Sequence, residues 1–326
     1  MAKSTEDTNS MMHGDDSPTK SIVVLYHTNC LDGFGAAYAA WCKLGDKADY
    51  IPVQYGEPIP VGLDNKLIYL VDFSYNEIEL LRLVAISCGV VVLDHHKTAE
   101  PNLAVVANAI GRHSGFHYVF DIDKSGAVLT WEYFHPNKPV PDLLLHIQDR
   151  DLWQFKLDGT KEICQALASP IWKREFVFWD KLANSHIGKR SDLYKCGDTL
   201  LADFKAKCQS LADKAYGVAI KWIMDDTTLF GCPIRDKGLA INAPAEYASE
   251  VGNLLAIKSG TYGAVWSYWG AGKYQVSLRS VGDYDVSVIA KYYGGGGHKN
   301  ASGFLVDKST GRKLELILQD LTNEPF

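Results

Sequence analysis

The chain has 326 residues, which suits two domains better than one, and its 47% hydrophobic and 22% charged residues are typical of a folded protein. Its longest apolar runs, such as 21–26 and 89–93, fall short of the roughly 18 to 20 residues that span a bilayer, which argues against a membrane-embedded protein. The formal net charge of −6 leaves room for a local basic groove, but it favours a small phosphorylated substrate over a long nucleic acid.

The first twenty residues and the cysteines bear on where the protein works. Residues 1–20 are polar and have no apolar segment, which predicts a disordered tail rather than a secretory signal. The seven cysteines are odd in number and scattered, at positions 30, 42, 88, 164, 196, 208 and 232. This distribution argues against a disulfide framework and against a structural zinc site, so we expect a reducing, cytoplasmic location.

Strands and helices alternate from Ile22 onward. Short β-branched or apolar runs predict buried strands at Ile22–Tyr26, Leu67–Val71, Gly89–Leu93 and, as a fourth, Val105–Ala109. Apolar residues at helical spacing predict helices at Gly33–Leu44, Asn76–Ser87, Ser125–Phe134 and Pro141–Gln148. The expected fold class is therefore α/β, with a mainly parallel sheet covered by helices and ligands bound beyond the carboxyl ends of its strands.

The second half of the chain predicts a connector and a smaller α/β domain. Asp158–Trp222 has helical spacing, and strand-like spacing returns over Thr227–Asn242. Tyr262–Trp269 and Tyr274–Ser280 indicate a pair of strands joined at Gly270-Ala271-Gly272. The predicted organisation is a tail over 1–20, a catalytic domain over 21–157, a helical connector over 158–224 and a second domain over 225–326.

Acidic and histidine side chains gather where the predicted strands and a later apolar segment end. They are His27 and Asp32, Asp72, the run Asp94-His95-His96, and Asp149 with Asp151. Taken singly, Asp72 is more often a turn or cap residue, and His27 a core histidine. Taken together at one edge of a sheet, carboxylates and imidazoles predict a site for Mn²⁺ or Mg²⁺, and two ions bridged by one carboxylate can hold a phosphoryl group.

Five segments resemble the motifs of one family. Val91-Val92-Leu93-Asp94-His95-His96 resembles the signature of the DHH phosphoesterase superfamily. Residues 26–37, 70–74 and 147–153 resemble its first, second and fourth motifs. Residues 294–304, Gly-Gly-Gly-Gly-His-Lys-Asn-Ala-Ser-Gly-Phe, resemble the glycine-rich motif of the DHH-associated C-terminal domain. The resemblance covers about residues 22 to 306 and extends to oligoribonuclease or nanoRNase-type members.

This resemblance implies a role for each matching residue. It implies two metal ions, with ligands His27, Asp32, Asp72 (bridging), His95 and Asp149. It places His96 beside the scissile phosphate and Asp94 behind the histidine pair as a support. Asp149 is preferred to the competing Asp151. Many relatives have an aspartate where this chain has Cys30, which is left open as either a ligand or a spectator.

The second domain is expected to grip the substrate. Gly296 and Gly297 let backbone N–H groups approach a ligand, and His298 is a donor to phosphate. Arg279 suits a bidentate contact with a phosphate or a base. The catalytic group would then be His96, Asp72 and Asp149, and the substrate-binding group His96, Arg279, Gly296, Gly297 and His298.

The leading hypothesis is a manganese-dependent phosphodiesterase, with Mg²⁺ as the alternative ion. It would hydrolyse short oligonucleotides, linear dinucleotides or cyclic nucleotides to mononucleotides. One alternative is a nucleotide-binding sensor or sponge that has lost catalysis, and another is a pyrophosphate or polyphosphate hydrolase. The expected partner is a short nucleotide substrate, with no membrane and no long duplex nucleic acid, and a homodimer is left open.

Overall fold

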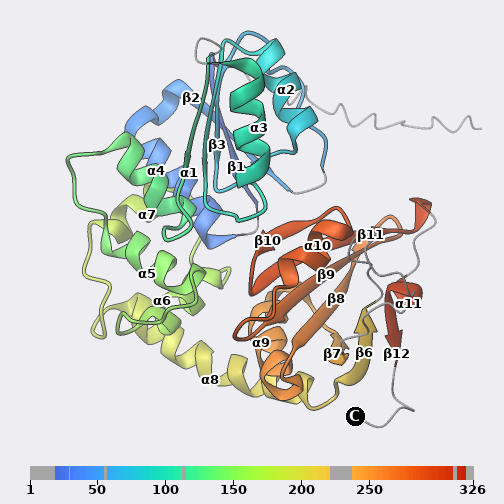
Figure 1. The fold of residues 1–326 in the computed structure, drawn as a ribbon. Helices are drawn as coiled ribbons and strands as arrows, with labels where there is room; N and C mark the ends of the chain where they lie inside the picture. Colours follow the sequence, from blue (N-terminus) through green and yellow to red (C-terminus); the bar gives the residue numbers. More distant parts are fainter. Residues whose placement is uncertain are drawn as a thin grey trace, which may run out of the picture.

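The computed structural model describes residues 19–28, 30–54, 57–111, 115–220, 237–310 and 314–320. The tail predicted over 1–20 lies outside these residues up to position 18, and Cys232 lies outside them too. Figure 1 shows two sheets, one in the blue and green part of the chain and one in the orange and red part, linked by the long helix α8 (Asp192–Ala212).

The first sheet is entirely parallel, as the α/β prediction requires. Its strands are β1 (Ile22–His27), β2 (Ala48–Val53), β3 (Leu67–Val71), β4 (Gly89–Asp94) and β5 (Phe116–Phe120). They lie in the order β2-β1-β3-β4-β5, and every neighbouring pair is parallel. All their carboxyl ends therefore lie along the same edge of the sheet, called the carboxyl edge. The chain continues from β1 to β2 on one side and from β3 to β4 and β5 on the other, so a topological switch point lies between β1 and β3.

Helices cover both faces of this sheet. Helices α1 (Leu31–Leu44) and α4 (Gly126–Phe134) lie on one face, and α2 (Glu77–Ile86) and α3 (Glu100–Ile110) on the other. Val24 of β1 packs against α1, whereas Val23 and Leu25 of the same strand pack against α2 and α3 on the other face. Burial on both sides explains why these strands are continuous apolar runs without alternation.

The structure corrects one predicted strand and adds two. Val105–Ala109 is part of α3, where Leu103 and Val106 are buried three residues apart and Val105 is 45% exposed. The missing strands are β2 and β5 at the two edges of the sheet. Edge strands are only partly buried, and Pro52 within β2 is acceptable there, so neither has the pattern of a central strand.

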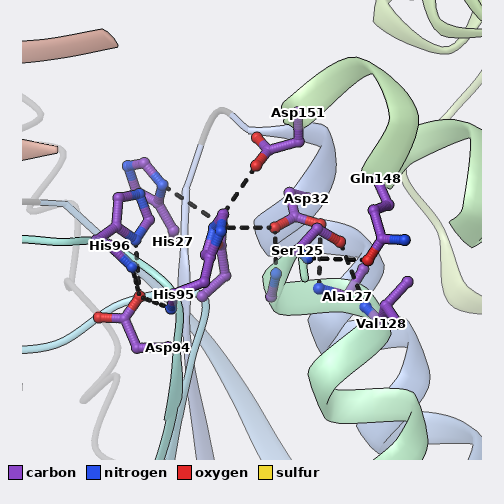
Figure 2. A network of polar contacts seen from close by, with 12 residues as sticks. His27, Asp32, Asp94, His95, His96, Ser125, Ala127, Val128, Gln148 and Asp151 are labelled. Atoms are coloured by element: carbon purple, nitrogen blue, oxygen red, sulfur yellow. Dashed lines mark hydrogen bonds and ion pairs between the residues drawn. The ribbon is translucent and has the colours of Figure 1, made fainter. Parts of the chain in front are cut away.

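A group of helices follows the first sheet. These are α5 (Asp142–Asp151), α6 (Thr160–Ala168), α7 (Phe176–Ala183) and α8. With α1 and α4 they enclose an apolar core around Trp179, which is fully buried against Phe34 and Tyr38. This core holds the C-terminal end of α5 beside the carboxyl edge of the first sheet (Figure 2).

The second sheet is mixed and has the order β10-β11-β9-β8-β7-β6-β12. Its strands are β6 (Tyr216–Ile220), β7 (Lys237–Asn242), β8 (Tyr262–Gly270), β9 (Lys273–Ser280), β10 (Gly296–His298), β11 (Ala301–Asp307) and β12 (Leu318–Asp320). Its helices are α9 (Ala248–Ser259), α10 (Val286–Tyr292) and α11 (Leu314–Ile317). Short 3₁₀ turns lie at Gly45–Lys47, Ala245–Tyr247 and Lys308–Thr310. The predicted strand pair 262–269 and 274–280 is confirmed as the antiparallel pair β8 and β9.

The helical prediction for 158–222 was wrong at its end, because β6 joins the second sheet. Val218 and Ile220 are β-branched and almost completely buried there, and this tertiary packing outweighs the helical spacing. The domain boundaries at 20, 157 and 224 stay a prediction. In the part of the chain that the structure describes, no helix is both long enough and apolar enough to cross a membrane.

Candidate active site

The carboxyl edge of the first sheet faces β10 of the second sheet. Thr98, just after β4, accepts a hydrogen bond through its hydroxyl from the Gly297 backbone N–H at 3.0 Å. Lys97 Nζ lies 2.5 Å from Asp285 Oδ2 at the start of α10. Arg150 at the end of α5 lies 4.0 Å from Glu250 of α9. These contacts place the glycine motif against the strand ends that carry the predicted ligands.

Asp72 follows β3 and has an unusual backbone. Its φ is +56°, in the left-handed region, which costs a residue other than glycine on the order of 1–3 kcal/mol. The residue is 1% exposed. A Cβ on Gly126 would lie 2.4 Å from Asp72 Cβ, so this conformation requires a glycine on the facing helix α4. The chain therefore sets this carboxylate at the sheet edge at an energetic cost.

Asp32 reaches the same place from the first turn of α1. A Cβ on Gly33 would lie 2.1 Å from the His27 carbonyl oxygen, so glycine lets the helix begin tightly against the end of β1. The two carboxylate oxygens of Asp32 accept hydrogen bonds from the backbone N–H groups of Gly126 at 2.6 Å and Ala127 at 3.0 Å. The N-terminus of α4 thus fixes the carboxylate in a buried position (Figure 2).

His95 lies at the centre of the group. Its Nε2 is 3.1 Å from Asp72 Oδ1 and 3.6 Å from both Asp32 Oδ2 and Asp151 Oδ2. Burial lowers the pKa of His95, but the hydrogen bond to Asp72 and the charges of Asp151, Asp72 and Asp32 outweigh it and raise the pKa to about 10. The carboxylates thus hold a positive charge strongly at this point, and a metal cation could replace that proton.

Asp94 supports the two histidines that follow it. Its Oδ1 accepts hydrogen bonds from the backbone N–H of His95 at 2.8 Å and of His96 at 3.1 Å, and lies 2.7 Å from His96 Nδ1 (Figure 2). Asp94 is completely buried. This geometry agrees with the supporting role expected for Asp94, because it fixes both the backbone turn and the orientation of the His96 ring.

His298 of β10 completes a cluster of three imidazoles. Its ring centroid lies 4.7 Å from that of His95 and 4.8 Å from that of His96, on which it stacks. Burial, followed by the charges of His96 and His95, lowers the pKa of His298 to about 2, so the ring is neutral. Its Nε2 is buried and has no hydrogen-bond partner among the described residues. The second sheet thus brings an imidazole directly to the ligand group.

The acidic and histidine side chains form two groups of potential ligands joined by Asp72. His27, Cys30 and Asp72 offer donor atoms that all lie within 4.8 Å of one another, and so do Asp32, His95 and Asp151. Asp72 Oδ2 is 3.7 Å from His27 Nδ1 in the first group, and Asp72 Oδ1 is 3.1 Å from His95 in the second. Asp72 therefore has the position expected of a bridging carboxylate.

Asp149, the preferred residue, and its competitor Asp151 lie in different surroundings, and only Asp151 is near His95. Asp149 accepts hydrogen bonds from the backbone N–H of Lys156 at 2.7 Å and of Leu157 at 2.9 Å, and from the Thr160 hydroxyl at 2.6 Å. It therefore shapes the turn between α5 and α6. Two residues on a helix differ by about 200° in direction, so only one of the pair points at the sheet edge, and that one is Asp151.

Arg279 and the glycine motif lie on the opposite wall. Arg279 donates to the Leu278 carbonyl at 2.9 Å and to the Ser249 hydroxyl at 2.7 Å. Burial, then the charge of Arg150, lowers the pKa of Arg279 to about 10, partly opposed by Glu250 and Asp151. A Cβ on Gly296 would lie 2.5 Å from the Thr98 hydroxyl and would displace it, and Gly297 has a φ of +133°, which strains any other residue.

Sequence reasoning missed Thr98 and Gly126, which carry no titratable group. The signal for Gly126 is a glycine in the first turn of a helix directly after the Ser125 cap, where glycine is unfavourable unless another backbone comes close. Thr98 follows the signature by two residues, but its contact is with a residue 199 positions away and has no local signal.

The ligand group suits a divalent cation. Burial, followed by the charges of Asp72 and Asp151, raises the pKa of Asp32 well above its usual range, which shows how strongly these carboxylates repel one another. Asp72 Oδ2 is buried without a hydrogen-bond partner among the described residues. A metal ion at this point would relieve the repulsion and satisfy the oxygen, so the residues fit such an ion.

Comparisons with known proteins found three similarities. The DHHA1 domain family matches residues 241–324. The uncharacterized protein R106 of Acanthamoeba polyphaga mimivirus is 34% identical over 316 residues, which are 88% of this chain and 70% of that protein. The solved structure of PggH, a pGpG-specific phosphodiesterase from Vibrio cholerae, matches with a TM-score of 0.42 and 13% identity, over 90% of this chain and 95% of that one.

Proposed function

Because the chain belongs to the DHH phosphoesterase superfamily and carries a DHHA1 domain, we propose that it is a metal-dependent phosphodiesterase acting on short nucleotides. Its substrates would be short oligonucleotides, linear dinucleotides or cyclic nucleotides, and its products mononucleotides. The observation that carries the proposal is the arrangement of two ligand groups joined by Asp72, with His298 of the second sheet in contact with the histidine pair.

Two divalent ions fit the ligand groups, with Mn²⁺ as the expected ion and Mg²⁺ as the alternative. Asp32, Asp72, His95 and Asp151 would hold one ion, and Asp72 would share the other with His27. Such ions supply a water of lowered pKa and Lewis acidity toward phosphoryl oxygens. The protein contributes the fixed positions of the ligands and a cluster of carboxylates that concentrates positive charge.

His96 is proposed to act on the reacting phosphate. Asp94 Oδ1 lies 2.7 Å from His96 Nδ1 and so fixes the orientation of the ring beside His298 of the second sheet. In this role His96 would donate a hydrogen bond to a phosphate oxygen or a proton to the leaving oxygen. His96 is therefore proposed as the catalytic histidine, and Asp94 as the residue that positions it.

The second sheet supplies recognition. His298 Nε2 is buried beside the histidine pair and suits a contact with a phosphate oxygen. Arg279 uses one N–H each on Leu278 and Ser249, and its remaining N–H groups suit a second phosphate or a base edge. A substrate with a second phosphate or a base beyond the scissile bond uses both residues, whereas pyrophosphate spans a much shorter distance.

The proposal is tested with a substrate panel. The full chain is incubated with Mn²⁺ and one substrate in each reaction. The substrates are pApA, oligoribonucleotides of three to five residues, a cyclic dinucleotide, pyrophosphate and polyphosphate. We expect mononucleotides from at least one nucleotide substrate and none with Asp72→Asn. Tight nucleotide binding without turnover would favour a sensor, release of orthophosphate from the inorganic substrates alone would favour a polyphosphate hydrolase, and either result contradicts the proposal.

A further inference from the structure

The side chain of Cys30 does not cap the helix that follows it, and its hydrogen-bond partner is His27. Cys30 is the residue that precedes α1, a position where Ser, Thr, Asp or Asn usually accepts a backbone N–H, yet its side chain makes no such bond. A thiol is a poor hydrogen-bond acceptor and would be a weak choice for a cap. The residue type at this position therefore needs another explanation.

The backbone directs Cys30 toward two ligand candidates. Gly33 lets the first turn of α1 press against the end of β1, which brings position 30 beside His27. The thiol sulfur, a ring nitrogen of His27 and a carboxylate oxygen of Asp72 all lie within 4.8 Å of one another. Asp72 is 1% exposed, and its Oδ2 has no hydrogen-bond partner among the described residues. A buried carboxylate oxygen thus lies close to both the thiol and the imidazole.

The two ligand groups differ in chemical softness. The group of Asp32, His95 and Asp151, together with Asp72, offers three carboxylates and one imidazole, a set that suits Mn²⁺ or Mg²⁺. The group of His27, Cys30 and Asp72 offers one sulfur, one nitrogen and one oxygen. Thiolate and imidazole ligands select Zn²⁺, Fe²⁺ or Co²⁺ over Mn²⁺ and Mg²⁺.

We propose that Cys30 is a metal ligand, and that it makes the site of His27, Cys30 and Asp72 selective for a borderline ion such as Zn²⁺, Fe²⁺ or Co²⁺. The neighbouring site of Asp32, Asp72, His95 and Asp151 keeps its preference for Mn²⁺ or Mg²⁺. The protein is then a mixed-metal enzyme whose two ions differ. On binding, the Cys30 S–H bond gives its proton to solvent and the sulfur forms a bond to the metal, with no change of oxidation state.

This inference rests on the proposed metal-dependent function, but its test is independent of activity. The full chain is freed of metal with a chelator and titrated with Co²⁺ under reducing conditions, and the absorption spectrum is recorded. A thiolate bound to Co²⁺ has a near-ultraviolet charge-transfer band that oxygen and nitrogen ligands lack. We expect this band to grow up to one equivalent of Co²⁺ and to disappear when Zn²⁺ is added.

Two variants and one control assign the band. Cys30→Ser conserves the size of the side chain, and Cys30→Asp introduces the residue that many relatives carry; both are expected to lose the band completely. Cys88→Ser removes an exposed thiol just before β4, at the opposite edge of the sheet, and is expected to keep the band. Circular dichroism establishes that each variant is folded.

Metal content supplies the second measurement. After exposure to equal Mn²⁺ and Zn²⁺ and removal of free ions, the wild type is expected to retain about one of each, and Cys30→Asp to retain more Mn²⁺ and less Zn²⁺. Two bound ions without a charge-transfer band, or identical metal ratios in the two proteins, would overturn the inference and leave the proposed function intact. A Cys30-dependent band in a protein that hydrolyses no nucleotide would support the inference and contradict the proposed function.

Discussion

The two walls of the site are built by different means. On the side of the first sheet, ligands are fixed by strand ends, helix N-termini and an energetically costly backbone at Asp72. On the side of the second sheet, His298 and Arg279 face the same space but are tied to the first wall by a few polar contacts, such as Thr98 with Gly297 and Lys97 with Asp285. Under the proposed function, the part of the chain with the first sheet carries the chemistry and the part with the second sheet carries recognition, and each should respond differently to mutation.

The largest effect is expected for Asp72→Asn. The amide has nearly the same shape but cannot bridge two cations, so we expect kcat/KM to fall by about 1,000-fold or more, since several kcal/mol of electrostatic stabilisation is lost. Metal content, measured by elemental analysis, should fall as well. Burial raises the pKa of Asp72, but its hydrogen bonds to His27 and His95 outweigh this effect and lower it, so loss of the carboxylate should also lower the melting temperature of the metal-free protein. Wild-type turnover in this variant would show that the two ligand groups do not share Asp72.

Asp151→Asn and Asp149→Ala test which of these two aspartates is the ligand. Asp151→Asn should lower kcat/KM by about 100-fold with little loss of stability, because the side chain faces the ligand group. Asp149→Ala should cost on the order of 2 kcal/mol in the free energy of unfolding, because it removes the charged acceptor of three hydrogen bonds. Its kcat/KM, assayed below its melting temperature, should stay close to wild type. The opposite pattern would restore Asp149 as the ligand.

His298→Ala probes the recognition wall. We expect a fall in kcat/KM of about 10- to 100-fold through loss of a phosphate contact, with metal content unchanged. Metal analysis and steady-state kinetics on the same preparation separate these outcomes. If the variant loses metal as Asp72→Asn does, His298 belongs to the chemical wall, and the contrast between the two domains disappears.

The smallest effect is expected for Lys97→Ala, which removes an ion pair between the walls. Both partners are partly exposed, so the pair contributes less than about 1 kcal/mol. We expect KM to rise a few-fold while kcat is unchanged, with the difference shrinking as salt is added. Asp285 is not suitable for this test, because it also caps α10. An effect that does not depend on salt would mean that Lys97 contacts the substrate itself.

The centre of the fold could be predicted from the sequence, whereas its edges could not. Strands β1, β3 and β4 are buried on both faces, so their residues are apolar without interruption. Strands β2 and β5 lie at the edges, where one side chain in two is free to be polar and the pattern weakens. The segment 105–109 has the composition of a strand, but Pro101 at the start of α3 and the buried positions Leu103 and Val106 make it a helix.

The same limit applies to the site. That ligands would gather at the strand ends follows from parallel topology, and the predicted residues His27, Asp32, Asp72, His95, His96 and His298 do come together. The choice between Asp149 and Asp151 depended on the rotation of α5 about its axis, which is set by packing in the core around Trp179. Sequence spacing fixes which residues share a helix, but not which of them faces a neighbour.

Gly126 bears on how mutational data for this enzyme should be interpreted. Any side chain at this position would displace Asp72, so the glycine is as necessary to the site as the carboxylate, although it has no functional group. An activity-based mutational scan would therefore rank Gly126 with the catalytic residues. In directed evolution of a new substrate range, positions 72 and 126 should therefore be kept unchanged together. Variation is better aimed at Ser249 and Arg279 on the other wall.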